Sequence, residues 1–388
     1  MPHNIPFNKP FIGGRELSYI SRAIERGEIG SDGFFTRACS QLLADKLLIR
    51  KPFITPSCTA ALEMAAILCG LKEGDEVIMP SFTFTSTANA VVLQGAKPVF
   101  VDIRPDTLNM DESLVEELIN KKTKVILPVH YAGVGCQMDR LMAIAQSYRL
   151  LVVEDAAQGV NAFHNGRALG SIGHLGAYSF HSTKNYTCGE GGALCVNAPE
   201  FFERAEVIRD KGTDRSKFLR GEVDKYTWVD VGSSYVPSEI TAAFLYAQLE
   251  MLDEIKERRR AVYEFYLRHL KELEGCGILR LPIIPDGYAA NYHMFHIMLQ
   301  DQATRDRLMF HLSQHNIQAV SHYVPLHTSA MGLRLGYAEG DLPVTEDSSA
   351  RILRLPFYTQ LTEEEQLRVV HTMELFFAGR RSRAARVS

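Results

Sequence analysis

Asp155 and Lys184 are the residues of this sequence whose types and placement best suit catalysis. Asp155 ends the apolar run 151–155, and Lys184 ends the segment 179–184, just before the glycine-rich stretch 189–192. Neighbouring strands that deliver such an acid and lysine to one place provide what a pyridoxal-phosphate site requires. The lysine forms a Schiff base with the cofactor, and the acid keeps the pyridine nitrogen protonated so that the ring can accept electrons.

The segments around this pair alternate between apolar strands and helices from about residue 55 onward. Strands are predicted at 76–80, at 97–102, at 125–130 and in the run ending at Asp155, and helices at 59–71, 85–93, 112–120 and 139–148. Because the strands are continuously apolar, they indicate a mostly parallel sheet that is covered on both faces.

Ligands bind such sheets in the crevice where the carboxyl ends of the strands meet. Asp155 and His130 both lie at predicted strand ends. This position favours a functional role for Asp155 over the alternative that its side chain only caps a following helix.

The later part of the chain indicates a second domain. An amphipathic stretch, 238–273, is expected to leave the sheet domain as one long helix. Beyond it the pattern restarts with strands around 293–299 and helices around 305–315 and 363–377. We therefore expect an α/β protein with a large, mostly parallel-sheet domain over residues 1–250 and a smaller α+β domain over residues 251–388, whose basic end, 380–386, forms a frayed tail.

The composition is that of an ordinary globular protein, with 388 residues, 46% of them hydrophobic, and a formal net charge of -4. This balance gives no reason to expect nucleic acid or membrane partners, and no apolar run approaches the roughly 20 residues that span a bilayer. The seven cysteines are unclustered, and His293, His322 and His327 lack the spacing of metal ligands, so neither a disulfide framework nor a metal site is expected. Without a signal-peptide pattern at the start, we expect a cytoplasmic protein.

Two places in the sequence could hold a phosphate group. Cys58 and Thr59 lie where a predicted helix begins, and backbone N–H groups and hydroxyls at a helix N-terminus bind phosphate. Ser179 is a second candidate anchor. Phe84, which follows a predicted strand, fits either a ring that stacks on a flat cofactor or a side chain of the core.

A polar stretch between two predicted helices carries several basic residues, among them Arg215, Arg220 and Lys225. As a solvated loop it needs no function. A substrate with a diphosphate would need such groups, because guanidinium and ammonium groups bind phosphate oxygens. The sequence leaves both interpretations open.

Segments 80–84, 153–158, 179–184 and 322–327 together resemble the DegT/DnrJ/StrS family of pyridoxal-phosphate-dependent sugar aminotransferases, and the similarity covers nearly the whole chain. The resemblance implies the aspartate aminotransferase fold, known as fold type I. It also implies a homodimer whose active sites are shared across the subunit interface.

The resemblance assigns roles to individual residues. Lys184 matches the Schiff-base lysine, and Asp155 matches the partner of the pyridine nitrogen. Further positions match the family's other ligand contacts: Gln158 at the ring hydroxyl, Phe84 on the ring face, Cys58, Thr59 and Ser179 at the phosphate, and His327 in a motif that helps to line the sugar site.

One segment departs from the family pattern. The family commonly has a Gly-x-Asn-Tyr segment, whose Asn reaches the cofactor phosphate of the partner subunit. Here the segment is 232–235, with Ser234 in place of the Asn. Serine can still donate a hydrogen bond, but its side chain has a shorter reach.

The resemblance also implies an activity. L-glutamate would donate its amino group, through pyridoxal phosphate, to the 4-keto group of dTDP-4-keto-6-deoxyglucose, and dTDP-4-amino-4,6-dideoxygalactose would be formed for a surface polysaccharide such as an O-antigen or enterobacterial common antigen. The basic stretch would then bind the dTDP diphosphate. The alternatives are amination at C3 or C4 of another dTDP-, GDP- or UDP-linked keto sugar, and a regulator that binds the cofactor without turnover. A sugar dehydratase is disfavoured because those relatives replace the lysine with histidine, and Lys184 is present here.

Overall fold

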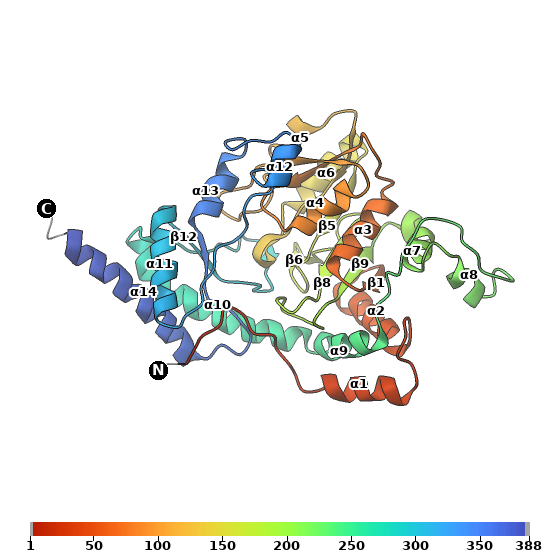
Figure 1. Cartoon of the computed structure of the whole chain (residues 1–388), viewed down its shortest axis with the longest axis horizontal. Helices are drawn as coiled ribbons and strands as arrows, with labels where there is room; N and C mark the ends of the chain where they lie inside the picture. Colours follow the sequence, from red (N-terminus) through yellow and green to blue (C-terminus); the bar gives the residue numbers. More distant parts are fainter. Residues whose placement is uncertain (1–2, 385–388) are drawn as a thin grey trace.

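The structure, a computed structural model, describes residues 3–384; the ends of the two predicted domains, residues 1–2 and 385–388, lie outside the description. A seven-stranded sheet forms the centre of the larger part of the molecule (Figure 1). In spatial order its strands are β1 (Lys51–Thr55), β9 (Gly192–Val196), β8 (Leu175–Ser179), β5 (Leu151–Asp155), β4 (Thr123–Ile126), β2 (Glu76–Pro80) and β3 (Lys97–Val101). Only β9 runs antiparallel to its neighbours, so the sheet is mostly parallel, as predicted.

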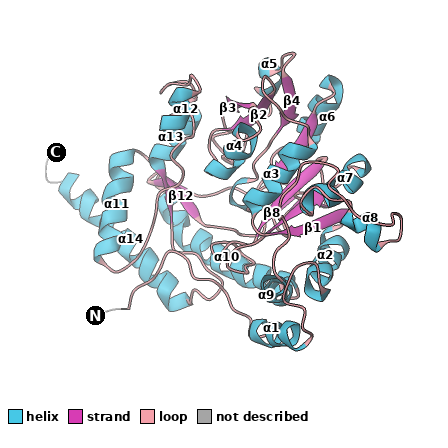
Figure 2. Ribbon diagram, turned by 45° about the vertical axis from the view of Figure 1, so that its right-hand side comes forward, coloured by secondary structure: helices cyan, strands magenta, loops and turns pink. Residues whose placement is uncertain are grey.

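Helices cover both faces of this sheet (Figure 2). Successive strand residues point to opposite faces, so Val152 packs in one apolar cluster and Val153 in another. The first cluster contains residues of α2 (Phe34–Leu47), α6 (Met138–Tyr148) and α9 (Glu239–Leu249). The second contains residues of α3 (Cys58–Leu68), α4 (Thr85–Val92) and α7 (Phe202–Arg209). Burial on both faces explains why the strands are continuously apolar.

A second, smaller core follows along the chain. The helix α10 (Leu252–Gly275) leads to a three-stranded antiparallel sheet of β10 (Leu279–Arg280), β12 (His296–Leu299) and β13 (Ile352–Arg354). Residues of α11 (Gln302–Gln314) and α14 (Glu363–Ala384) complete this core. Ile5 also packs there, so the N-terminal segment crosses from the larger part of the molecule to the smaller one.

The remaining elements are short or lie at the surface. They are α1 (Glu16–Glu25), α5 (Val115–Leu118), α8 (Arg215–Leu219), α12 (Ala330–Arg334) and α13 (Pro343–Arg351), the 3-10 turns at Tyr131–Gly133 and Pro199–Phe201, and the strands β6 (Phe163–His164), β7 (Arg167–Ala168) and β11 (Tyr288–Ala289). Among the described residues, no helix is long and apolar enough to cross a membrane.

Several predicted elements differ from the observed ones. The predicted helix 238–273 is two helices, α9 and α10, with a break at residues 250–251. The predicted strand 125–130 ends at Ile126, because Pro128 has no N–H group to donate to a ladder. The backbone of the predicted frayed tail is helical as far as Ala384.

Candidate active site

A cavity of about 580 Å³ lies at the carboxyl ends of β5 and β8, between the two parts of the molecule. It is lined by Asp155, Lys184 and most of the other predicted cofactor residues, namely Cys58, Thr59, Phe84, Gln158 and Ser179. β5 and β8 are adjacent and parallel, so their ends carry the acid and the lysine to the same edge of the sheet. The topology therefore provides the juxtaposition that their spacing predicts.

Asp155 is the last residue of β5, and its carboxyl group is buried. The hydroxyl of Thr87 donates a hydrogen bond of 2.8 Å to its Oδ2 atom, and the backbone N–H of Ala157 donates one of 3.1 Å to Oδ1. Burial raises the pKa of this carboxyl group, whereas the two hydrogen bonds and the charge of Lys184 favour its ionised form. A buried carboxylate of this kind stabilises a proton on a group that faces it.

Lys184 follows the end of β8, where its backbone N–H donates to the carbonyl oxygen of His181. Burial in the cavity lowers the pKa of its ammonium group, and the negative charge of Asp155 opposes this shift. A lowered pKa increases the fraction of neutral amine, which is the nucleophilic form.

The N-terminus of α3 forms another wall of the cavity. The Ser57 hydroxyl accepts a hydrogen bond from the N–H of Ala60 and so caps the helix, while the hydroxyls of Thr59 and Ser86 lie 2.8 Å apart. Gly192, the first residue of β9, packs against the backbone of the turn before α3. A Cβ atom at this position would lie 2.4 Å from the backbone N of Cys58. Hydroxyls and the positive end of the helix dipole make this wall suitable for a phosphate group.

Gln158 and Phe84 provide polar and flat surfaces in the cavity. The side-chain oxygen of Gln158 accepts from the N–H of Ala132 at 2.7 Å, and its amide donates to the hydroxyl of Tyr323 at 3.2 Å, so the side chain is held at both ends. Phe84 remains 59% exposed although it is a large apolar side chain. An exposed ring on a cavity wall fits a stacking role better than a core role.

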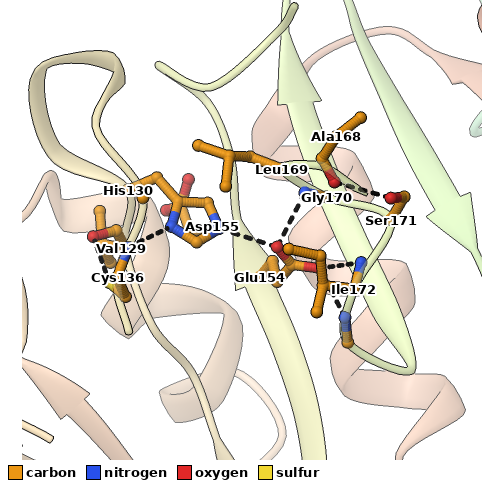
Figure 3. Close-up of polar contacts among 12 residues, drawn as sticks. Val129, His130, Cys136, Glu154, Asp155, Ala168, Leu169, Gly170, Ser171 and Ile172 are labelled. Atoms are coloured by element: carbon orange, nitrogen blue, oxygen red, sulfur yellow. Dashed lines mark hydrogen bonds and ion pairs between the residues drawn. The ribbon is translucent and has the colours of Figure 1, made fainter. Parts of the chain in front are cut away.

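His130 and Glu154, which do not line the cavity, form a buried polar network at the strand ends (Figure 3). The backbone N–H of Cys136 donates to Nδ1 of His130, so Nε2 carries the proton and donates to Glu154 at 2.8 Å. The same carboxylate accepts from the backbone N–H groups of Gly170, Ile172 and Gly173. The backbone N–H of His130 also donates to the carbonyl oxygen of Asp155. This network therefore fixes the end of β5.

The glycine-rich loop 170–176 does not have the spacing of a nucleotide-binding loop. Its backbone N–H groups bind Glu154 in the network described above. A Cβ atom at Gly176 would lie 2.3 Å from the carbonyl oxygen of Gly170. The loop therefore packs backbone against backbone and binds Glu154, and its glycines have a structural explanation.

The cavity of a single chain does not include all of the predicted site residues. His327 is completely buried: its Nδ1 atom lies 2.7 Å from the Ser81 hydroxyl, and its Nε2 atom 2.9 Å from Glu346. Ser234 and the basic residues Arg215, Arg220 and Lys225 belong to a segment away from the cavity. Within the chain, Arg215 pairs with Asp210, and Arg220 pairs with Glu206 and Glu222.

Sequence reasoning missed other residues on the cavity wall: His293, His322, Tyr323 and Arg354. His322 and Tyr323 belong to the segment 322–327, which supports the family resemblance, whereas the sequence offers His293 only as a metal ligand. In the part of the chain that the structure describes, no three His, Cys, Asp or Glu side chains gather as a metal site. Burial lowers the pKa of both imidazoles, so both rings are neutral near neutral pH. The stacking of His322 on Tyr323, with ring centroids 3.6 Å apart, makes a flat neutral wall.

The residues present fit pyridoxal phosphate. Lys184 can hold its aldehyde carbon, Asp155 its pyridine nitrogen, and the α3 N-terminus its phosphate, while Phe84 and Gln158 lie on the same cavity.

Comparison with known proteins gives a consistent result. The chain matches the DegT/DnrJ/EryC1/StrS aminotransferase family over residues 10–374. It is 37% identical to a protein of Geobacillus stearothermophilus described as a pleiotropic regulatory protein, over 82% of each chain. It is 31% identical to the spore coat polysaccharide biosynthesis protein SpsC of Bacillus subtilis, over 94% of each chain. Among solved structures, the PLP form of Spr1654 from Streptococcus pneumoniae has a TM-score of 0.88 at 26% identity, covering 96% of this chain and 98% of that one.

The chain therefore belongs to the DegT/DnrJ/EryC1/StrS aminotransferase family. This family and its structural neighbours are sugar aminotransferases with the fold of pyridoxal-phosphate-dependent enzymes, which confirms the predicted fold class. The predicted cofactor, pyridoxal phosphate, is also confirmed, and Spr1654 has been solved in both PLP and PMP forms.

Proposed function

We propose that this protein transfers the amino group of L-glutamate to the 4-keto group of dTDP-4-keto-6-deoxyglucose and forms dTDP-4-amino-4,6-dideoxygalactose. The observation that carries an aminotransferase activity is the placement of Lys184 and Asp155 on adjacent strand ends in one cavity. The choice of sugar is supported by the resemblance of the segments 56–65 and 212–235 to the transaminase that makes this product. Synthesis of a bacterial surface polysaccharide is the corresponding role.

The side chains have separate tasks in this reaction. When bound, pyridoxal phosphate supplies an electron sink that permits an amino group to be exchanged between an amino acid and a carbonyl compound. The Nζ atom of Lys184 holds the cofactor and, when free as a neutral amine, takes the α-proton of the amino donor. The carboxylate of Asp155 holds a proton on the pyridine nitrogen, and the neutral rings of His322 and Tyr323 wall the cavity.

We also propose that the working unit is a homodimer with shared cavities. The segment 210–238 projects with α8 from the body of the larger part (Figure 1) and exposes large apolar side chains, among them Leu219, Trp228, Val229 and Val231. Such a patch favours burial against a second copy. Ser234 and the basic residues of this segment would then reach the partner's cavity, where Ser234 meets the cofactor phosphate and Arg215, Arg220 and Lys225 meet the diphosphate.

For His327 we propose a positioning role beside the sugar. Its contacts with Ser81 and Glu346, together with the hydrogen bond from the N–H of Leu326 to the carbonyl oxygen of Ser81, tie the loop 322–327 to the end of β2. This loop carries His322 and Tyr323, which line the cavity. His327 would therefore position this part of the cavity wall, although its own side chain does not line the cavity.

The proposal is tested with L-glutamate, dTDP-4-keto-6-deoxyglucose and the cofactor-loaded protein, and the product is identified by NMR. A 4-amino product with the C4 coupling constants of a galactose configuration is expected, and Lys184→Ala is expected to remove turnover and the absorbance of the lysine-bound cofactor. A glucose configuration, or a 3-amino product from another nucleotide sugar, would replace the substrate assignment. Absence of turnover with every keto sugar would favour a regulator, the function by which the Geobacillus relative is described.

A further inference from the structure

His293 is a residue of the cavity wall to which the proposed reaction assigns no task. It lines the cavity together with Lys184, and both side chains also line a smaller hollow of about 10 Å³ beside it. A hollow of this size has room for about one water molecule, so no ligand fits between the two side chains there. His293 therefore packs close to the lysine on which the proposed chemistry depends.

The hydrogen bonds of His293 determine which of its ring nitrogens carries the proton. The amide nitrogen of Asn185 donates to the carbonyl oxygen of Asn291 at 2.8 Å, which leaves Oδ1 of Asn185 as an acceptor. Nδ1 of His293 lies 2.9 Å from this oxygen and is therefore the donor. Burial, together with nearby positive charges, lowers the pKa of His293 well below its usual range, so the ring is neutral and Nε2 keeps a free lone pair. Among the described residues, no group donates a hydrogen bond to Nε2.

The backbone at His293 is held in a costly arrangement. Tyr292 has a φ of 54°, in the left-handed region that a bulky side chain rarely adopts. Arg259 of α10 is buried, and its guanidinium donates to the carbonyl oxygens of Tyr292 and His293 at 2.9 and 2.6 Å. Strain of this kind persists only where the surroundings enforce it, and it gathers at functional sites. The position of the His293 ring is thus fixed from the backbone by Arg259 and from the side chain by Asn185.

Several charged or titratable groups face Lys184, namely Asp155, Arg354, Cys58, His293 and His322. The carboxylate of Asp155 is assigned to the pyridine nitrogen, and Arg354 can only donate hydrogen bonds. Burial raises the pKa of the Cys58 thiol, so it is neutral, and its sulfur is a weak acceptor. Nδ1 of His322 is engaged with the hydroxyl of Tyr131 at 2.8 Å. Nε2 of His293 is therefore the nitrogen acceptor best placed for the amine of Lys184.

We infer that Nε2 of His293 accepts a hydrogen bond from Nζ of Lys184 whenever this nitrogen is not bonded to the cofactor, an inference that rests on the proposed aminotransferase function. The stem of a free lysine is flexible, and a fixed acceptor holds its amine near the carbon atoms between which it moves a proton. After Lys184 takes the α-proton, one N–H of its ammonium group donates to Nε2, and the proton stays on Nζ because His293 is too weak a base to remove it. His293 is thus a positioning residue that acts through Lys184.

The first test measures the pKa of Lys184 in the cofactor-free full-length protein, from the pH dependence of its acetylation by acetic anhydride, followed by mass spectrometry. His293→Asn places an amide N–H where Nδ1 lies, so it keeps the contact with Asn185 but removes Nε2. The lost acceptor favoured the ammonium form, so the pKa of Lys184 is expected to fall by about one unit. His293→Gln places its amide oxygen near the position of Nε2 and is expected to keep the pKa closer to that of wild type.

The second test follows the half-reaction of the cofactor-loaded protein with L-glutamate, by absorbance in a single turnover without keto sugar. His293→Asn is expected to lower the rate at saturation about 10-fold, to leave the half-saturating glutamate concentration unchanged, and to increase the isotope effect with α-deuterated glutamate, because only proton transfer is slowed. His293→Gln is expected to restore part of the rate.

His269→Asn is the matched control. Nδ1 of His269 donates to the carbonyl oxygen of Phe265 on α10 at 2.9 Å, so this ring has the same protonated nitrogen, and it does not line the cavity. This variant is expected to leave the pKa of Lys184 and the half-reaction as in wild type. Thermal melts of the variants establish that each is folded.

Three results would overturn the inference. The first is an unchanged pKa of Lys184 in His293→Asn. The second is a greater loss in His293→Gln than in His293→Asn, which would show that the ring serves only its contact with Asn185. The third is a raised half-saturating glutamate concentration at an unchanged rate, which would assign His293 to the substrate. The acetylation test uses no cofactor, amino acid or sugar, so it remains readable if the proposed aminotransferase function fails.

Discussion

At the scale of single residues, the role that we propose for Asp155 requires its buried carboxyl group to remain ionised. Burial alone raises its pKa, and a protonated carboxyl group cannot stabilise a positive pyridine nitrogen. Thr87 opposes burial with a direct hydrogen bond, and its own hydroxyl lies 2.8 Å from that of Thr83. Both hydroxyls are buried, so this short chain of hydrogen bonds is shielded from water. Thr87 thus acts on the proposed chemistry through its hydrogen bond to Asp155.

Thr87→Val keeps the shape of the side chain and removes the donor. The hydrogen bond favours the carboxylate, so its loss raises the pKa of Asp155 further. As the pH drops, Asp155 is then protonated at a higher pH than in wild type. Activity that requires the carboxylate is therefore also lost at a higher pH. We expect the acidic limb of the kcat profile to move upward by about one pH unit.

The control for this change is Thr372→Val, which removes a buried hydroxyl that donates to the carbonyl oxygen of Arg368 on α14, far from the cavity. Its acidic limb is expected to match that of wild type. An unshifted profile in Thr87→Val, or a shift toward lower pH, would show that Thr87 does not set the ionisation of Asp155.

At the scale of elements, the contact between β9 and the turn before α3 fixes the position of the wall that we propose for the cofactor phosphate. Gly192 lies between Thr55 of β1 and Ser179 of β8 in the sheet register, and its α-carbon faces the backbone of residues 57–58. An added methyl group would lie 2.4–2.5 Å from backbone atoms, which cannot rotate away as a side chain would. The close approach therefore requires glycine at this position.

Gly192→Ala is expected to destabilise the protein by about 1–3 kcal/mol and to weaken cofactor binding, because β9 and the α3 N-terminus must separate. Thermal melts and a titration of the cofactor-free protein with pyridoxal phosphate measure the two effects. Gly275→Ala is the matched control, since it lies at the end of α10 with no atom within 4 Å of the added methyl group. A Gly192→Ala variant with the stability and cofactor affinity of wild type would contradict the role of this contact.

Some helices and strands lie where the sequence predicts them, and others do not. β2 and the start of α4 lie where the sequence predicts them, because apolar runs bounded by Pro and Thr residues are strong local signals. The predicted helix 112–120 shrinks to α5 (Val115–Leu118), because the side chains of Asp111 and Asn120 accept backbone N–H bonds at both ends and form turns instead.

The sequence predicts some residues of the candidate site and gives no signal for others. Asp155 and Lys184 each end a marked apolar segment, so their spacing alone predicts a shared edge of the sheet. Arg354 ends β13, a short strand of the second core, and nothing in its local sequence indicates that it lines the same cavity as Lys184, far away along the chain. Only the structure reveals that its Nε atom is buried without a hydrogen-bond partner.

At the scale of the whole molecule, the segment 210–238 is difficult to explain in a single chain. It carries Trp228, the only tryptophan, at 74% exposure, and a row of other exposed apolar side chains. It also carries Arg215 and Arg220, whose side chains remain 42% and 43% exposed although they pair with Asp210, Glu206 and Glu222. Exposed pairs of this kind contribute little to stability. A second subunit that covers the apolar side chains and receives the basic groups explains both features together.

This arrangement predicts complementation between two defective chains. A chain with Arg215, Arg220 and Lys225 all changed to Ala is expected to show a raised KM for the keto sugar and low activity, and Lys184→Ala is expected to be inactive. In a mixed dimer, one cavity combines an intact Lys184 with the intact segment of the other chain. Random exchange of subunits should therefore restore up to about a quarter of wild-type activity.

The readouts are sedimentation, to establish that the chains pair, quenching of Trp228 fluorescence, which should weaken on pairing, and turnover of the mixture. A mixture of the triple variant with itself is the control for exchange. If the chains pair but activity is not restored, the basic residues act in their own subunit or not at all. Restoration would assign the diphosphate contacts to the partner's segment. The described residues that line the cavity of one chain include no such cluster of cations, so this cavity would then be half of the working site.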